Sequence, residues 1–194
     1  MEILEIITLS KKNITDFAKE RNLLLSKAKK EWVFFIDSDE VINNLEFTGK
    51  AGQASLTINN KFSGYKIRRD NYFLGQYVGS EKIIRLAKKS AGKWERRVHE
   101  IWKINGKVGY INNPVIIHNT AGNLNQYIKK INYYSDLHAQ ANKEEKKKSN
   151  LFKIIFYPIA KFIVTLIKSK NMVFSIMQAF HSYLSWSKLY FLHS

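Results

Sequence analysis

The apolar run at residues 32–36, followed at once by the carboxylates of Asp37, Asp39 and Glu40, constrains the fold of this chain more than any other segment. Trp, Val, Phe, Phe and Ile in succession predict a short strand that is covered on both faces. The carboxyl end of such a strand is where open α/β sheets place their ligands. The run therefore predicts an α/β protein with a site at residues 37–40.

The segment before this strand completes a β-α-β unit. Residues 2–9 are apolar and rich in β-branched side chains, which predicts a buried strand. Residues 17–28 repeat apolar side chains at helical spacing, and Asn13 or Thr15 is the expected cap of that helix. We expect the strands at 2–9 and 31–36 to be parallel neighbours joined by a right-handed crossover.

Beyond Asp39 the pattern changes to shorter, alternating segments separated by Gly and Asn. Such segments are typical of mixed or antiparallel sheets. The expected strands are residues 64–69, 82–87, 98–104 and 108–117, and the expected helix is 124–142. The predicted fold class is thus α/β, with an α/β domain over residues 1–142 and a basic, apolar helical segment over residues 143–194.

Charge narrows the classes of partner. The chain holds 32 Lys and Arg against 16 Asp and Glu, a net charge of +16, and its second half is the more basic one. This surplus favours nucleic acid, an anionic membrane surface or a phosphate-bearing substrate. Cysteine is absent, which excludes disulfides, thiolate metal sites and a cysteine nucleophile. Glu2 and Glu5, without a positive n-region, argue against a signal peptide.

The C-terminal segment combines lysines with apolar residues. Lys153, Lys161 and Lys168 fall within an arc of about 80° at 100° per residue, and the rest of residues 151–167 is mainly apolar. The stretch is too short and too charged for a span of about 20 apolar residues. Two interpretations stay open, namely an amphipathic helix in the lipid headgroup layer and a helix packed on the protein's own core.

The acidic cluster after the apolar run is the strongest candidate for chemistry. Alternation along a strand sends Asp37 and Asp39 to the same side. Carboxylate oxygens in this position suit Mg²⁺ or Mn²⁺ that carries substrate phosphates. The alternative is a solvated acidic turn, since Asp and Ser are common turn residues. The position directly after a buried strand favours the metal site.

A second group of candidates lies later in the chain. His99 is a candidate base or metal ligand, and Glu100 is a candidate general base for a hydroxyl nucleophile. In a regular strand, Arg97 and His99 would share one face. The alternative is a surface strand with a cross-strand ion pair. His118, at the end of an apolar run, is either a metal ligand or a polar strand end.

Several of these motifs occur together as they do in bacterial family 2 glycosyltransferases. Residues 17–22 (Phe-Ala-Lys-Glu-Arg-Asn), Ala28 and residues 31–40 resemble the central block of that family, and more narrowly of its lipopolysaccharide core branch. Further matching positions are Arg85-Leu86, Trp94, Val98-His99-Glu100, Pro114 to His118 and Tyr127 to Ser135. The combination is more specific than any single motif.

The resemblance implies a partial GT-A-like, Rossmann-like mixed sheet with amphipathic C-terminal helices. It also implies a nucleotide-sugar donor, and the donor-binding residues that it indicates are Arg21, Asn22 and Asp37. Asp37 and Asp39, with His118, would hold Mg²⁺ or Mn²⁺ at the donor diphosphate.

The resemblance further implies which groups would carry the reaction. In an inverting transfer, a carboxylate takes the proton of the acceptor hydroxyl as that oxygen attacks the sugar. Glu100 is the first candidate for this base and Glu40 the second, with His99 beside Glu100 as an orienting or metal-contacting group.

The chain departs from the family pattern at its N-terminus. Family members place further strands and helices before the strand at residues 2–9, including an acidic uracil contact and an Asp-x-x-Ser-x-Asp turn, and the chain has neither. We expect an N-terminally truncated domain, a second chain that supplies the missing half, or a decayed remnant. An open sheet edge of this kind would invite pairing with another chain.

The leading prediction is a glycosyltransferase that moves a sugar from a nucleotide-sugar donor to a cell-envelope glycan or lipid-linked acceptor. It would be cytoplasmic and peripheral at the inner face of the cytoplasmic membrane. The alternative is a basic, non-enzymatic module that binds an anionic membrane surface or nucleic acid. Nucleic acid is less favoured, because many lysines crowd into residues 143–170 instead of spreading over the aromatic-bearing strands.

Overall fold

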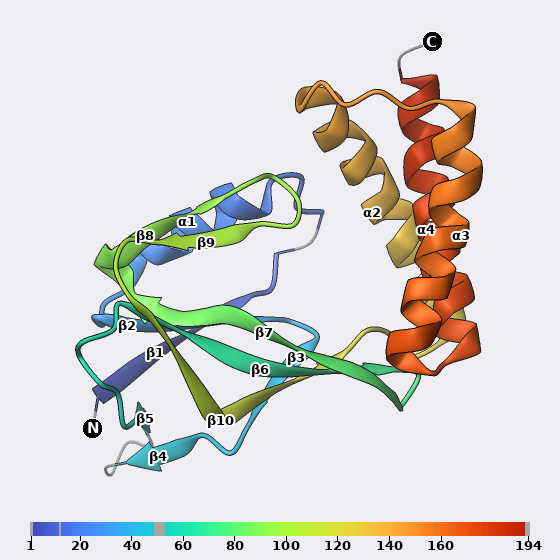
Figure 1. Ribbon diagram of the computed structural model, residues 1–194. Coiled ribbons are helices and arrows are strands. Elements are labelled where there is room, and N and C mark those ends of the chain that lie inside the picture. The colour runs from blue at the N-terminus through green and yellow to red at the C-terminus, as the bar shows by residue number, and fades with distance from the viewer. Residues whose placement is uncertain (1, 12, 49–52, 193–194) are drawn as a thin grey trace. The chain divides into compact units, whose positions relative to one another are not determined.

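The computed structural model describes residues 2–11, 13–48 and 53–192, and its centre is a mixed sheet (Figure 1). The described strands form an eight-stranded sheet in the order β3-β10-β6-β7-β2-β1-β5-β4 and a separate two-stranded sheet of β8 and β9. Their bounds are β1 Glu2–Leu9, β2 Trp32–Asp37, β3 Glu40–Asn43, β4 Glu46–Thr48, β5 Gln53–Leu56, β6 Gly64–Phe73, β7 Gln76–Lys88, β8 Gly92–Glu95, β9 Ile101–Ile104 and β10 Val108–Asn119. The α/β class predicted from the sequence is confirmed.

The chain divides into two compact units, which are described separately. The sheet unit comprises residues 1–70 and 80–118, and the helical unit comprises residues 71–79 and 119–194. The sequence places the boundary at 142/143 instead. The structure differs because α2, Leu124–Glu144, packs on α4, Met172–Phe191, within the helical unit.

The predicted β-α-β unit is present. β1 pairs in parallel with β2, from Leu4 opposite Trp32 to Leu9 opposite Asp37, and α1, Phe17–Lys27, connects them. The cap prediction is wrong by a few residues. Asp16, not Asn13 or Thr15, caps α1, and its carboxylate accepts a hydrogen bond from the backbone N–H of Lys19.

Both faces of β2 are buried, as the apolar run predicts. Trp32 and Phe34 lie in a cluster with β6, β7 and β10, while Val33 and Phe35 lie in a second cluster that includes α1, β8 and β9. Phe35 makes edge-to-face contacts with Trp94 and Trp102, which stack on one another. Strand alternation thus sends neighbouring side chains of β2 into different cores.

The edge beyond β1 is not left open in the way the sequence suggests. β5 lies antiparallel to β1, with Glu2 opposite Leu56 and Ile3 opposite Ser55, and β4 follows as the outermost strand. Strands β4 and β5 come from the polar segment after residue 45. The periodicity of this segment does not show which strand it pairs with.

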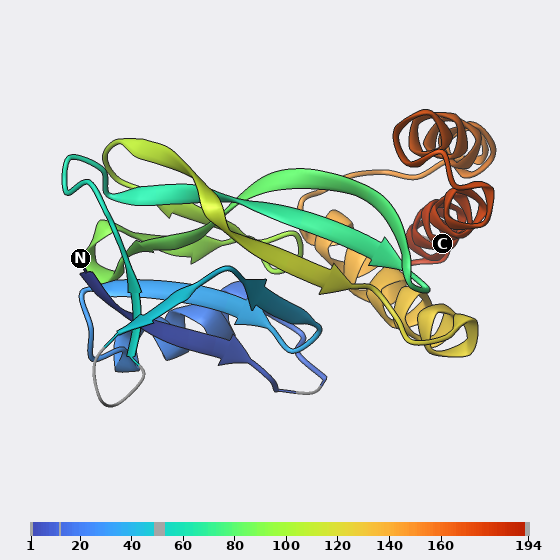
Figure 2. The same ribbon diagram turned by 90° about the horizontal axis from the view of Figure 1, so that it is seen from below.

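The long strands β6, β7 and β10 run beside one another in the middle of the sheet (Figure 2). The expected strands at 64–69, 82–87 and 108–117 lie within these three strands, each of which is longer than predicted. The strand expected at 98–104 is shorter, because β9 begins only at Ile101. Arg96 and His99 have positive φ values of 73° and 54°, which no regular strand allows. The predicted alternation of residues 97–100 is therefore wrong.

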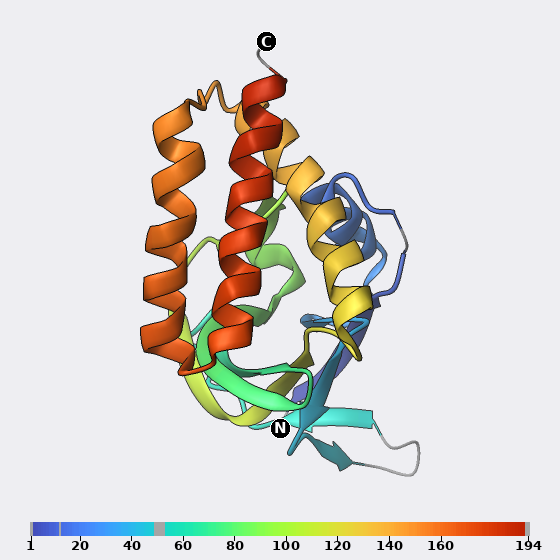
Figure 3. The same cartoon turned by 90° about the vertical axis from the view of Figure 1, so that its right-hand side faces the viewer.

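The helical unit contains three helices, and α4 lies between α2 and α3, Leu151–Ser169 (Figure 3). Each helix begins at an asparagine whose side chain accepts a backbone hydrogen bond in the first turn. These caps are Asn123, Asn150 and Asn171. Only Lys170 and Asn171 separate α3 from α4, so the two helices form an antiparallel hairpin. Among the described residues, no helix combines the length and hydropathy that crossing a membrane requires.

Candidate active site

Asp37, the last residue of β2, lies between two arginines from neighbouring elements. Arg21 of α1 donates from Nη2 to Asp37 Oδ1 at 2.5 Å, and Arg85 of β7 donates from Nη2 to Asp37 Oδ2 at 2.7 Å. Both arginine side chains are almost fully buried, with 1% and 7% exposed. Burial of unpaired guanidinium groups would be very costly, so Asp37 supplies the charge that keeps both arginines inside.

The arginines also shift the acidity of Asp37. Burial alone would raise the pKa of this carboxyl, but the charges of Arg85 and Arg21 outweigh burial and hold the pKa below its ordinary value, against a smaller opposing effect of Asp39. Asp37 is therefore a carboxylate across the physiological pH range. Both of its oxygens accept hydrogen bonds from the arginines.

The guanidinium groups have a second source of stabilisation. Arg21 lies 4.6 Å and Arg85 lies 5.9 Å from the ring centre of Trp94. Among the described residues, Arg21 Nη1 and Arg85 Nε are buried without a hydrogen-bond partner. The electron-rich face of Trp94 compensates for part of that loss.

Glu40 is the most buried carboxylate of the cluster, with none of its side chain exposed. Its Oε1 accepts from Arg69 Nη1 at 2.8 Å, and its Oε2 accepts from the backbone N–H of Asp37 at 2.9 Å. Arg69 in turn donates to Glu81 at 2.7 Å. Burial by itself would lower the pKa of Arg69, but Glu81 and Glu40 raise the pKa above its ordinary value. Glu40 is thus fully buried and hydrogen-bonded, so its carboxylate is not accessible to an acceptor hydroxyl.

Asp39 and His118 approach each other from different strands. Asp39 lies in the turn after β2, and His118 on β10 lies opposite Glu40 in the ladder with β3. His118 Nε2 is 3.5 Å from Asp39 Oδ2, and the side chains are 17% and 35% exposed. The structure therefore brings together two of the three residues that the sequence proposes as metal ligands, in a place that solvent reaches.

Glu100 enters the same cluster through Arg21. Arg21 Nε donates to Glu100 Oε1 at 3.0 Å, so one guanidinium group joins Glu100 to Asp37. The Glu100 side chain is 15% exposed. The neighbouring His99 is exposed. The positive φ at His99 turns the chain so that the two side chains do not follow strand geometry.

Asn22, which the sequence predicts as a contact of the nucleotide-sugar donor, links two elements of the sheet unit. Its side-chain amide donates to the carbonyl oxygen of Trp94 and accepts from the backbone N–H of Trp94, both at 2.9 Å. This pair of bonds ties α1 to β8 and fixes the Trp94 ring beside Arg21. The predicted contact between Asn22 and a donor stays a prediction.

Sequence reasoning did not foresee the roles of Arg85 and Arg69. Arg85 matched the family pattern, and both residues lie on strands that had been predicted, but their carboxylate partners are 12 to 48 positions away in the chain. A buried strand position occupied by arginine, such as Arg85 among Ile84, Leu86 and Ala87, is the signal that points to a buried acid.

The side chains present could hold a divalent cation only if water or substrate oxygens supplied the rest of its ligands. In the described part of the chain, no group of three or more His, Cys, Asp or Glu side chains forms a metal cluster. Mg²⁺ commonly takes one or two protein ligands and completes its shell with water and substrate phosphates. Asp39 and His118 meet this requirement, whereas the oxygens of Asp37 already serve the two arginines.

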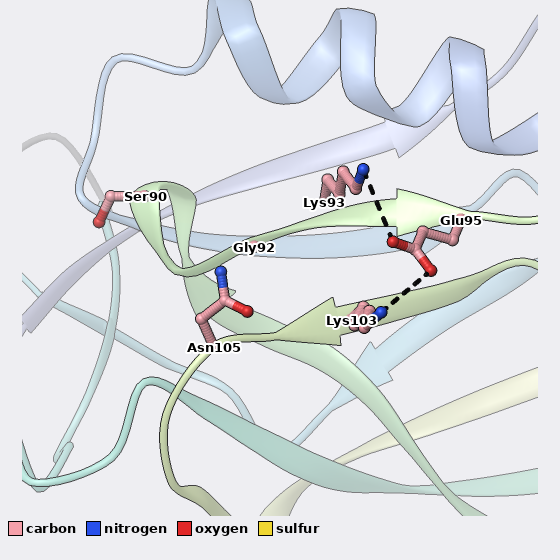
Figure 4. A pocket seen from close by; sticks show the side chains of 6 residues that line it. All are labelled: Ser90, Gly92, Lys93, Glu95, Lys103 and Asn105. Carbon is pink, nitrogen blue, oxygen red and sulfur yellow. Dashed lines mark ion pairs between the residues drawn. The ribbon is translucent and has the colours of Figure 1, made fainter.

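A separate shallow pocket lies on β8 and β9 (Figure 4). Lys93 and Lys103 both pair with Glu95 there, each at 3.7 Å, so the two lysines share one carboxylate. Nothing in its geometry connects it to the carboxylates at the end of β2.

No protein-family model matches the chain. Over 192 residues the chain is 22% identical to the lipopolysaccharide core biosynthesis glycosyltransferase LpsC of Rhizobium meliloti (strain 1021), an alignment that covers 92% of this chain and 70% of that protein. The relationship is thus to a glycosyltransferase. It supports glycosyl transfer in general and does not favour the non-enzymatic alternative.

Proposed function

We propose that this chain carries the catalytic site of a glycosyltransferase of the family 2 type, which transfers a sugar from a nucleotide-sugar donor to a cell-envelope glycan or lipid-linked acceptor. The observation that supports this most strongly is the placement of three candidate residues around Asp37 at the carboxyl end of β2. Glu100 shares Arg21 with Asp37, and Asp39, two residues after Asp37, lies beside His118. The distant relative, a lipopolysaccharide core glycosyltransferase, agrees with this chemistry.

Asp39 and His118 are the proposed ligands of Mg²⁺ or Mn²⁺. When bound, the cation would neutralise the charge that develops on the departing diphosphate. Asp37 does not bind this cation in our proposal. It holds Arg21 and Arg85 in place, so that the turn bearing Asp39 is anchored directly after β2.

Glu100 is the proposed general base. As the acceptor oxygen forms its bond to the anomeric carbon, the bond from that carbon to the diphosphate oxygen breaks, and the hydroxyl proton passes to Glu100. Arg21 orients the base by holding Oε1, which leaves Oε2 to take the proton. In this proposal the acceptor attacks from the face opposite the leaving group, so the anomeric centre is inverted. Localisation at the inner face of the cytoplasmic membrane is part of the same proposal.

A binding and turnover experiment tests these roles separately. Thermal shift with a panel of nucleotide-sugars, with and without Mn²⁺, is expected to show Mn²⁺-dependent stabilisation by at least one donor. Asp39→Ala is expected to abolish that shift. Glu100→Gln is expected to keep the shift but to lower release of the nucleoside diphosphate by about a hundredfold or more, the usual contribution of a general base.

Two results would overturn the proposal. One is the absence of any shift across the panel with the wild-type chain. The other is a donor shift of equal size in wild type and Asp39→Ala. Salt-sensitive nucleic-acid binding that Asp39→Ala leaves unchanged would instead support the basic-module alternative.

A further inference from the structure

The outer surface of α3 is apolar along its whole length. Six large side chains, each 50% or more exposed, fall within an arc of about 120° on the helix. They are Phe152, Ile155, Phe156, Ile159, Ile163 and Ile167. No charged residue lies in this arc, because Lys153, Lys161 and Lys168 occupy a different side of the helix. A helix that covered the protein's own core would bury such a stripe.

α4 repeats the pattern. Five large apolar side chains, 40–55% exposed, fall within an arc of about 100°. They are Met172, Val173, Ile176, Phe180 and Tyr183. The opposite side of α4 is the buried one, where Met177 packs with Tyr127 and Ile131 of α2. We call the six residues of α3 and the five of α4 together the exposed apolar face.

The two stripes lie on the same side of the hairpin. Buried Thr165 of α3 and buried Ser175 of α4 mark the sides on which the helices meet. Angular position advances in opposite senses in antiparallel helices, so both stripes then turn to one side and the α3 lysines turn to the other. Monomeric soluble proteins rarely expose contiguous apolar patches beyond a few hundred Å², and such patches mark interaction or membrane sites.

The charges carried by the hairpin and the segment just before it have one sign, although Lys147 pairs with Glu145 and Lys188 pairs with Asp136, both of which precede this segment. Residues 146–194 contain no Asp or Glu, whereas they contain eight lysines. Lys170 stands at the turn of the hairpin, and Lys146, Lys147 and Lys148 stand at its open end. Lysine on the polar side and large apolar groups on the other is the pattern of helices that lie in a membrane interface.

We propose that the α3–α4 hairpin is an anchor that lies flat on an anionic lipid bilayer, with the exposed apolar face in the boundary between headgroups and acyl chains. An anionic bilayer supplies both an apolar phase and a counter-charge. A second copy of this chain would cover the apolar face but would bring the same acid-free, lysine-rich segment. The proposal stands independently of glycosyl transfer, because none of the residues of the active site takes part.

Vesicle co-sedimentation with the full chain tests the anchor. Vesicles of phosphatidylcholine with 30% phosphatidylglycerol are the anionic probe, and pure phosphatidylcholine vesicles are the neutral probe. A lysine near an anionic surface contributes about fivefold in binding. We therefore expect the anionic vesicles to bind at least about tenfold more tightly, with binding weakened at high salt.

A matched pair of variants locates the contact. Ile163→Glu and Leu23→Glu add the same charge at apolar residues of equal exposure, 50% and 49%, but Leu23 lies on α1. Ile163→Glu is expected to weaken vesicle binding by about tenfold or more, since it places a charge in the apolar boundary. Leu23→Glu is expected to change binding by less than about twofold. Circular dichroism is expected to show the same helix content in both.

Three outcomes would overturn the anchor. The first is no binding of the wild-type chain to anionic vesicles. The second is equal loss of binding in the two variants. The third is a dimer in light scattering that Ile163→Glu converts to monomer while vesicle binding is absent, which would assign the face to a second copy of the chain.

Discussion

The two units handle charge and apolar surface in opposite ways. In the sheet unit, arginines and carboxylates lie inside and pair with one another, as in the set Arg21, Arg85 and Asp37. In the helical unit, large apolar side chains such as Ile163 and Ile167 lie outside, 50% and 72% exposed. The buried charges of the sheet unit thus pair within that unit. The helical unit leaves large apolar side chains exposed. The comparison teaches that buried charge marks the candidate site here, whereas exposed apolar surface marks the candidate contact with a partner.

The largest effect on this contrast between the units is expected from removal of Asp37, the central carboxylate of the sheet unit. Asp37→Ala is expected to lower the free energy of unfolding by about 3–5 kcal/mol, because it breaks two buried ion pairs at once. Among the described residues, Arg21 would keep only Glu100, and Arg85 would keep only a 3.4 Å contact with Glu40. Urea unfolding measures the loss. Asp39→Ala is the matched control, with an expected loss below about 1 kcal/mol, since its side chain is partly exposed. Equal losses in the two variants would contradict a special role of Asp37.

The dependence of stability on pH in the acidic range tests the same residue, Asp37. The pKa of Asp37 is lower in the folded chain than its ordinary value. Its contribution is therefore present above the ordinary carboxyl pKa, and it is lost as pH falls through the lowered folded value. Asp37→Ala is expected to remove this part of the acid slope. A slope that is the same in wild type and Asp37→Ala would assign acid unfolding to other groups.

The dependence of stability on pH in the alkaline range tests the helical unit. Burial raises the pKa of Tyr127 to about 12, although a hydrogen bond from Gln178 opposes the shift. Between about pH 10 and 12 the unfolded phenol ionises while the folded one stays protonated, so stability falls with rising pH, by roughly 2–3 kcal/mol at most. Tyr127→Phe is expected to flatten this fall. Unfolding of both proteins at pH 8 and pH 11 measures the difference.

The close contact between β8 and β9 gives the next smaller effect. A Cβ at Gly92 would lie 1.9 Å from the carbonyl oxygen of Lys103, so Gly92→Ala forces the two strands apart. We expect a loss of about 1–3 kcal/mol in the free energy of unfolding. Gly122→Ala in the helical unit is the control, because its Cβ would meet only the flexible end of Gln126 at 3.1 Å. Similar losses of stability in both variants would contradict the close approach of Gly92 to Lys103.

The smallest expected effect belongs to the exposed apolar face. Ile163→Glu is expected to change the free energy of unfolding by less than about 0.5 kcal/mol in the absence of lipid, because the side chain is half exposed. Leu189, fully buried on the same hairpin, gives the contrast, and Leu189→Glu is expected to cost several kcal/mol. A large loss in Ile163→Glu would show that this face is part of the core.

Much of the fold was predictable from local pattern. The run at residues 32–36 reads as a strand covered on both faces because each of its side chains is apolar, and the structure buries all but Ile36 completely. The helix at α2 and the strands β6, β7 and β10 follow from periodicity in the same way. The turn at residues 96–100 did not follow, since its positive φ values at Arg96 and His99 leave no mark in hydrophobic pattern.

The candidate site was predictable in its residues but not in its contacts. Sequence indicated Asp37, Asp39, Glu100 and His118, because acidic or imidazole groups stood at strand ends and in a family pattern. It could not distinguish Asp37 from Asp39. Only the positions of Arg21, Arg85 and His118 in the tertiary structure decide that Asp37 pairs with two arginines while Asp39 lies beside His118.

The sequence by itself determined the β-α-β start, the buried central strand, the acidic cluster at its end and the acid-free basic C-terminus, because these depend on neighbouring residues and short periodicities. Tertiary structure decided which charges pair, which carboxylate lies beside His118, where the helical unit begins and which side of α3 stays exposed. Those outcomes depend on contacts between residues tens of positions apart, which strand order and helix packing alone bring together.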